Sequence, residues 1–115
     1  MLIEVGVKKL KEALEDDRLC RRWYGVEMAK KIRLRMDALY AADSLADLWP
    51  PGTGPERCHE LKGDMAGLFS VDLKHPYRLL FRPIDLPGAL PASDEKERWK
   101  SITAIEIVEI KDTHG

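Results

Sequence analysis

The chain has 115 residues, of which 44% are apolar and 34% charged, and its 19 basic and 20 acidic side chains leave a formal net charge of −1. This length suits one domain with a modest core, and this composition argues against disorder. No apolar run approaches the roughly 20 residues that cross a bilayer, and the N-terminus lacks the layout of a signal peptide. We therefore expect a cytoplasmic protein with no membrane partner, in which any nucleic-acid contact is a local basic patch.

The N-terminal residues predict a strand followed by helix. Residues 3–5 suit a short first strand, and apolar side chains then recur at helical spacing over residues 7–14. Asp16-Asp17 either ends this helix or caps a further helical turn, and Gly25 is the clearest break.

Residues 26–40 have the strongest helical period of the chain, with an apolar stripe that includes Met28, Ile32 and Met36. A basic run lies along the same helix: Lys30, Lys31, Arg33 and Arg35. It is either a solvated surface, which we favour, or a contact with phosphates or an acidic partner. Ser44 and Asp47 have capping-box spacing and predict one short helical turn before a connecting loop at residues 50–55.

Residues 59–82 predict a β-hairpin around which the chain is organised. Alternation places apolar side chains of both strands on one face: Phe69, Val71, Leu73, Tyr77, Leu79 and Phe81. Arg78 and Arg82 then project from the other face. They are either a phosphate-binding pair or solvated arginines on a half-buried hairpin, and spacing alone favours the second.

Two segments follow the hairpin. Residues 83–100 contain three prolines and predict a long loop with at most one helical turn after Ser93, which either touches a partner or is a tolerated insertion. Residues 102–110 are rich in β-branched side chains and predict the last strand. The apolar residues of this strand occupy alternate positions on one face and then switch to the other face, which indicates a strand covered on both faces or a bulge near Ile107.

The sequence favours neither a metal nor an organic cofactor. Its candidate N and S ligands lack the short regular spacing of zinc sites: Cys58, His59, His75 and His114. No glycine-rich phosphate loop or nucleophilic-serine motif is present, and we interpret Cys20 and Cys58 as free thiols.

One string of residues resembles the HigB toxins of the RelE superfamily. It consists of His59-x-Leu61-Lys62-Gly63-Asp64, Gly67, Phe69-Ser70 and Tyr77-Arg78 leading to Phe81. The resemblance extends to Ala41–Leu48, Pro50-Pro51-Gly52 and Glu109–His114, and it is absent from 83–100. It implies a single α+β domain over residues 1–115, with a small, mainly antiparallel sheet and two N-terminal helices packed on one face.

The resemblance also implies a function. Such a chain is the toxin of a type II toxin–antitoxin pair, a metal-independent, ribosome-dependent mRNA endonuclease in which the 2′-oxygen attacks the adjacent phosphate. Its partners are a helix-turn-helix antitoxin of the HigA kind, the ribosome and mRNA, and it reaches operator DNA only through the antitoxin.

The site residues follow from the same positions. His59 and His114 match catalytic histidines, and imidazole can act as acid or base near neutral pH. Asp112 supports them or takes part directly. The basic positions that hold the RNA in this family are matched by Lys62, Lys74 and Arg78. Arg78 is also counted as catalytic, and Arg82 joins the phosphate-binding set from its place on the hairpin.

Thr113 departs from the pattern, because the family usually has tyrosine there, whose ring can stack on an RNA base. A second hypothesis is therefore a binding module that has lost catalysis and acts through an antitoxin in operator regulation. Its support is the near-neutral charge, Thr113 and the long insertion.

Overall fold

The computed structural model describes residues 1–85 and 93–113. Strands and helices follow one another in the order β1 (Leu2–Val5), α1 (Lys8–Glu15), α2 (Asp17–Tyr24), α3 (Val26–Ala41), β2 (His59–Glu60), β3 (Phe69–Asp72), β4 (Tyr77–Pro83), α4 (Glu95–Ser101) and β5 (Ala104–Asp112). Short 3-10 turns occupy Leu45–Leu48 and Gly63–Met65. This is the α+β architecture predicted from the sequence.

The five strands form one mixed sheet in the order β1-β5-β4-β3-β2. β1 runs parallel to β5, and the other three pairings are antiparallel. Leu80 pairs with Glu109 whereas Phe81 pairs with Ile107, so β5 bulges at Val108. The bulge explains why the apolar parity of this strand changes, as the sequence indicated.

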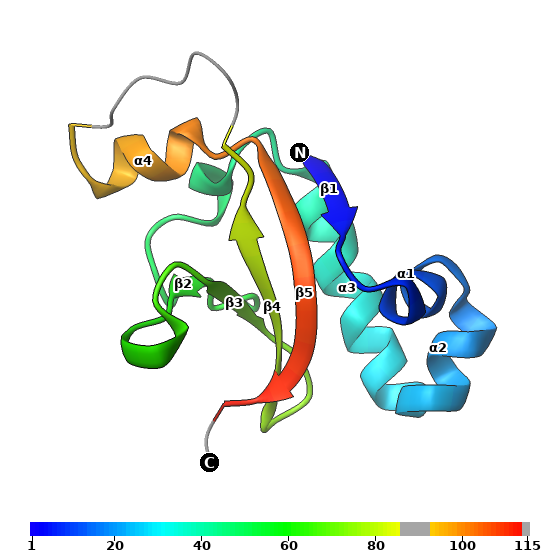
Figure 1. Cartoon of the computed structure of the whole chain (residues 1–115). Coiled ribbons are helices and arrows are strands. Elements are labelled where there is room, and N and C mark those ends of the chain that lie inside the picture. The colour runs from blue at the N-terminus through cyan, green and yellow to red at the C-terminus, as the bar shows by residue number, and fades with distance from the viewer. Residues whose placement is uncertain (86–92, 114–115) are drawn as a thin grey trace.

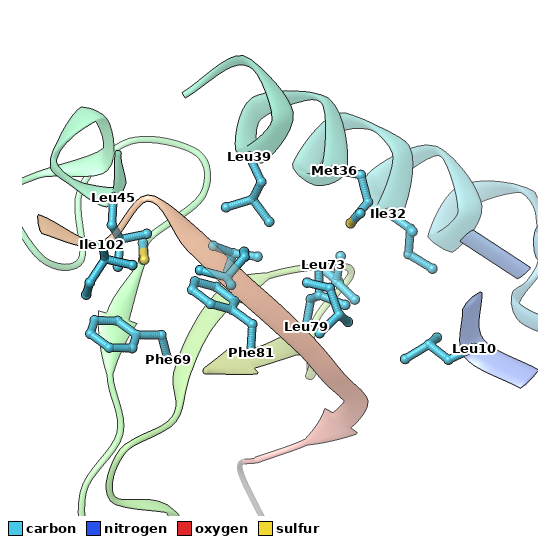
Figure 2. Packing of buried hydrophobic residues seen from close by; sticks show 14 of the residues in the cluster. Leu10, Ile32, Met36, Leu39, Leu45, Phe69, Leu73, Leu79, Phe81 and Ile102 are labelled. Atoms are coloured by element: carbon cyan, nitrogen blue, oxygen red, sulfur yellow. The ribbon is translucent and has the colours of Figure 1, made fainter. Parts of the chain in front are cut away.

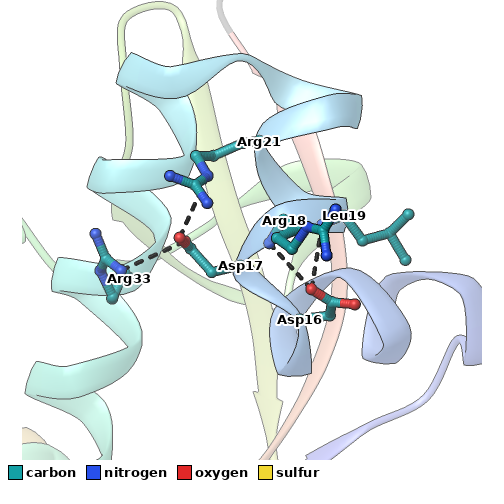
Figure 3. Close-up of polar contacts among 6 residues, drawn as sticks. All are labelled: Asp16, Asp17, Arg18, Leu19, Arg21 and Arg33. Atoms are coloured by element: carbon teal, nitrogen blue, oxygen red, sulfur yellow. Dashed lines mark hydrogen bonds and ion pairs between the residues drawn. The ribbon is translucent and has the colours of Figure 1, made fainter.

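The N-terminal helices number three, so the prediction of two was wrong. Asp16 separates α1 from α2, and its carboxylate accepts the backbone N–H groups of Arg18 and Leu19 at 3.0 and 3.3 Å (Figure 3). Asp16 therefore ends α1 and is also the N-cap of α2. Gly25 joins α2 to α3 with φ +86°, a conformation that glycine adopts without strain.

The core lies between α3 and one face of the sheet. Figure 2 shows Ile32, Met36 and Leu39 of α3 above side chains of β3, β4 and β5. Phe69 faces Phe81 and Val71 faces Leu79 in the ladder, and all four are fully buried. The apolar face predicted for the hairpin is thus confirmed for these residues, while Tyr77 at the strand end is 44% exposed.

Arg35 corrects the interpretation of the basic run on α3 as solvated. Lys30, Lys31 and Arg33 are exposed, but Arg35 is only 7% exposed. Its Nε donates to the backbone carbonyl of Asp72 over 2.6 Å, so this arginine ties α3 to the end of β3. A buried guanidinium needs such a partner, because removing an unpaired ion from water costs on the order of several kcal/mol.

The segment 83–100 is not a loop throughout. Residues 86–92 lie outside the described part of the chain, but Glu95–Ser101 forms α4, capped by the Asp94 carboxylate at the N–H of Glu97. Its Trp99 is fully buried and meets Phe69 and Trp49 edge-to-face, with ring centroids 5.5 and 5.1 Å apart. In Figure 1, α4 lies apart from the three N-terminal helices, at the opposite end of the sheet from the C-terminus.

Among the described helices, none combines the length and apolarity that crossing a membrane requires.

Candidate functional site

His59 stands on the edge strand β2, on the face of the sheet opposite α3. It pairs with Ser70 of β3, which pairs in turn with Leu80 of β4, so these three side chains share the face that the core does not use. The His59 ring lies 3.1 Å from the carbonyl oxygen of Arg57 through Nδ1. A carbonyl can only accept, so Nδ1 carries the proton and Nε2 of the neutral ring keeps a lone pair that can take a proton.

Arg78 lies in the next cross-strand row of the same face. It pairs with Asp72 of β3 in the ladder, and its Nε is 3.2 Å from the Asp72 carboxylate. Arg57 reaches the other oxygen of the same carboxylate, also at 3.2 Å. The Arg78 side chain is 18% exposed and that of Arg57 is 63% exposed. One carboxylate therefore holds two guanidinium groups beside the row that contains His59.

Arg82 is on the same face but does not join Arg78. The two are four residues apart on β4, which is about 13 Å along a strand. Arg82 is paired with Glu106 of β5, its partner in the ladder. Each arginine of the predicted pair thus has its own carboxylate, and a single phosphate cannot bridge both at this spacing.

The two predicted phosphate-binding lysines lie in different places. Lys62 is exposed and precedes the turn Gly63–Met65, three residues after His59. Lys74 is exposed in the β3–β4 turn, where its Nζ contacts the Glu27 carboxylate of α3 at 2.5 Å. The hydrogen bond and charge of Lys74 in this contact hold the pKa of Glu27 below its usual value. Lys74 points towards the helices in this arrangement.

The described C-terminal member of the predicted site lies across the sheet from His59. Asp112 ends β5 opposite Tyr77, whereas His59 is on β2, so β3 and β4 lie between them, which is about 14 Å of sheet width. His114 lies outside the described residues. The described end of β5 lies beside Tyr77 and Arg78, which pair with Asp112 and Lys111.

The prediction from sequence missed one part of this site. A pocket of about 210 Å³ lies under the β3–β4 turn, and its lining includes Arg57, Asp72, His75, Tyr77 and Arg78. Arg57 belongs to no motif and reaches the pocket only because residues 53–57 fold back on β3, where the N–H of Asp72 donates to the carbonyl of Glu56 over 2.7 Å. Ser70 Oγ, next to His59 in the ladder, is buried and makes no hydrogen bond within the described residues.

The arrangement offers a base and a set of cations for phosphate chemistry. His59 presents a proton acceptor, and Arg57 and Arg78 present guanidinium groups that can stabilise charge on phosphate oxygens. In the described part of the chain, no group of three or more His, Cys, Asp or Glu side chains is arranged to hold a metal ion. Cys20 and Cys58 are both buried as free thiols.

No protein-family model matches the sequence, and no curated protein matches it. Solved structures do match. The YoeB/ParE toxin from Agrobacterium tumefaciens aligns with a TM-score of 0.57 and 15% identity over 99% of this chain and 100% of its own. YoeB in the YoeB–YefM complex from Staphylococcus aureus aligns with a TM-score of 0.54 and 17% identity, over 96% of this chain and 95% of its own. The YoeB dimer of the same organism gives 0.53 and 16%, over 96% and 94%. The chain therefore has the α+β fold of the RelE/YoeB toxins.

Proposed function

We propose that this protein is the toxin of a type II toxin–antitoxin system, a HigB-like mRNA interferase that cleaves mRNA on the ribosome without a metal ion. The observation that carries the proposal is the His59 ring, which is held through Nδ1 by the Arg57 carbonyl and presents Nε2 beside the Arg57–Asp72–Arg78 cluster. A RelE/YoeB toxin fold with this motif on the sheet face opposite α3 supports the same function.

The reaction is an attack of a ribose 2′-oxygen on the adjacent phosphorus. His59 Nε2 takes the 2′-OH proton, the new O–P bond closes a 2′,3′-cyclic phosphate, and the bond from phosphorus to the 5′-oxygen breaks. His114 returns a proton to the leaving 5′-oxygen and Asp112 supports it. Arg78 stabilises the charge on the phosphate oxygens, and Lys62, Lys74 and Arg82 hold flanking phosphates.

The proposed partner is a helix-turn-helix antitoxin of the HigA kind, which carries the toxin to operator DNA. Complex formation with an antitoxin is known for the structurally similar YoeB, which was solved bound to YefM. We expect the antitoxin to bind this chain as YefM binds YoeB, and to cover the toxin until translation must be stopped.

Induced expression in a host without the antitoxin tests the function. Wild-type protein should arrest translation within minutes and produce cleaved mRNA with 5′-hydroxyl ends. His59→Ala should lower single-turnover cleavage by about 10²–10⁴-fold, the usual contribution of a general base, and Arg78→Ala should lower it as well. If both variants inhibit growth and cleave mRNA as wild type does, the assignment is wrong.

A second candidate is a catalytically inactive binding module that acts only through its antitoxin. It is favoured by the acidic partners of the cations on this face, since Arg57 and Arg78 share Asp72 and Arg82 is paired with Glu106. It predicts that wild-type protein binds the antitoxin but leaves mRNA intact in the same expression experiment.

A further inference from the structure

The strand that carries His59 is short and stands at the edge of the sheet. β2 consists of His59 and Glu60 alone, and β3 is its neighbour in the sheet. The next residue, Leu61, extends the pairing by donating its N–H to the carbonyl of Leu68 over 2.8 Å. Strands in globular proteins usually have about 3–10 residues, so a ladder of this length holds its residues weakly. The position of His59 therefore depends on contacts made by the side chains of this segment.

Glu60 makes such a contact on the other face of the strand. Successive side chains of a strand point to opposite faces, so Glu60 projects away from the face that presents His59. Its carboxylate is held by Arg98 of α4, whose Nη1 donates to Oε1 over 2.6 Å and whose Nη2 donates to Oε2 over 3.1 Å. One planar guanidinium engages both oxygens, so this pair fixes the orientation of the carboxylate as well as its distance.

α4 holds this guanidinium firmly, because the next residue of the helix belongs to the core. Trp99 is fully buried against Phe69, and the guanidinium carbon of Arg98 lies 5.6 Å from the centre of the same Phe69 ring. Phe69 is also the ladder partner of Glu60. The ring, the guanidinium and the carboxylate thus meet at one point, which sets this pair apart from an isolated surface ion pair with loose geometry.

We propose that Arg98 is a positioning residue of the candidate site, which holds β2 in place through Glu60 and thereby fixes the His59 ring. This role rests on the proposed function in taking His59 as the base, and it gives α4 a part in that reaction. α4 lies within residues 83–100, outside the resemblance to HigB toxins, so the motif that identified His59 gives no sign of it. Arg98 acts through the strand and not on the RNA.

Amide hydrogen exchange followed by NMR tests the support of β2 without any substrate. Arg98→Met keeps an apolar stem over Phe69 but has no donor for Glu60. The N–H of Leu61 should then exchange about fivefold or more faster than in wild type, as expected when local opening no longer breaks a charge-assisted contact. The N–H of Leu73 is the control, since it donates to the Tyr77 carbonyl over 3.0 Å in the β3–β4 turn. It should exchange at the wild-type rate.

The His59 ring gives a second measurement. At alkaline pH, where imidazole is neutral, the NMR shifts of the two ring nitrogens show which of them carries the proton. We expect the proton on Nδ1 in wild type, since the Arg57 carbonyl accepts from that nitrogen, and a mixture of both tautomers in Arg98→Met. A side chain that only stabilises the fold would leave this distribution unchanged.

Single-turnover cleavage of ribosome-bound mRNA tests the consequence for the reaction. Arg98→Met should lower the maximal rate by about tenfold or more, because a general base acts only when it is correctly placed, and should leave the half-saturating concentration within about twofold of wild type. Glu60→Gln should have the same effect. The double variant should be no slower than either single variant, because both changes break one contact.

Arg21→Met is the matched control. The Arg21 side chain is 49% exposed and is paired with Asp17 at 3.3 Å, whereas that of Arg98 is 42% exposed. Arg21 lies on α2 and has no contact with β2 among the ion pairs of the described residues. Its replacement should leave the exchange of Leu61, the tautomer of the ring and the cleavage rate unchanged.

The role of Arg98 is overturned if Arg98→Met keeps the wild-type exchange of Leu61 and the wild-type tautomer of His59. It is also overturned if Leu61 and Leu73 exchange faster by the same factor, since the loss is then one of global stability. Glu60→Gln, which preserves the size of the side chain, decides the same points if Arg98→Met does not fold.

Failure of this role is distinct from failure of the nuclease. If His59→Ala abolishes cleavage while Arg98→Met cleaves as wild type does, the positioning role alone is wrong. If wild-type protein cleaves no mRNA but Arg98→Met releases Leu61 and the His59 ring, the nuclease alone is wrong and Arg98 still positions the ring.

Discussion

Arg35 donates from α3 to the backbone carbonyl of Asp72, 2.6 Å away, and so joins the helical layer to the candidate site. On the other face, the Asp72 carboxylate holds Arg57 and Arg78. Asp72, at the end of β3, thus contacts three arginines, one through its backbone carbonyl and two through its carboxylate. Asp72 is therefore a structural link between the core and the face proposed to bind RNA.

Replacing Asp72 by asparagine should lower the free energy of unfolding by about 1–3 kcal/mol, because Arg78 is mostly buried and loses its counter-ion. Urea denaturation monitored by circular dichroism measures the change. Asp17→Asn is the matched control, since Asp17 also bridges two arginines, Arg21 and Arg33 at 3.3 and 3.4 Å (Figure 3), but on an exposed surface. It should cost at most about 1 kcal/mol. Equal losses in the two variants would contradict the role given to Asp72.

Trp99 makes α4 part of the core. Trp99→Ala should lower the free energy of unfolding by about 3–5 kcal/mol, because it leaves a cavity between Phe69 and Trp49. Trp23→Ala is the control, since Trp23 is 37% exposed on α2 and should cost far less. Both are measured by urea denaturation, and a Trp99 variant as stable as the Trp23 variant would show that α4 is a detachable segment.

Local patterns were sufficient for most of the fold. The alternation of Phe69, Val71, Leu79 and Phe81 predicted the buried face of the hairpin, and Gly25 marked a real helix boundary. The prediction failed where residues distant in sequence decide the outcome. Three prolines in residues 83–91 made the whole segment up to residue 100 resemble a loop, although Trp99 reaches a core that only the folded sheet creates.

The candidate site shows the same limit. The motif identified His59 and Arg78, which do lie in neighbouring rows of one face. It could not identify Arg57, because that residue enters the pocket through a turn with positive φ that no periodicity records. It also could not show that Arg35 is buried, since its backbone partner on β3 is 37 residues away in sequence.

Cys58 predicts a loss of stability at high pH. Burial, together with the nearby Glu56 carboxylate, raises the pKa of its thiol from the ordinary 9.0 to about 12. Between these values the folded chain keeps a proton that the unfolded chain loses, so the free energy of unfolding falls as pH rises, by up to about 1.4 kcal/mol per pH unit. Below the lower value both states hold the proton and this effect vanishes.

Urea denaturation of wild type and Cys58→Ala on both sides of the ordinary thiol pKa measures this effect. The difference between the two proteins should be constant below that pKa and should change in favour of the alanine variant above it. Cys20→Ala is the control, because burial also raises the pKa of that thiol but less strongly. A difference that stays constant throughout would show that Cys58 becomes accessible in the folded protein.

The contact between Glu27 and Lys74 predicts a gain of function from removing an acid. Lys74 is a proposed phosphate ligand, yet its ammonium group is held by Glu27 at 2.5 Å, on the helical side of the β3–β4 turn. Glu27→Gln weakens this hold, so Lys74 should turn to RNA. Binding of a single-stranded oligonucleotide made of 2′-O-methyl nucleotides, in which the attacking hydroxyl is blocked, should strengthen, and the slope of log K against log salt should steepen by about 0.7. Glu12→Gln on α1 removes the same charge away from the turn and should leave the slope unchanged. If the two variants behave alike, Lys74 braces the turn against α3 and does not bind RNA.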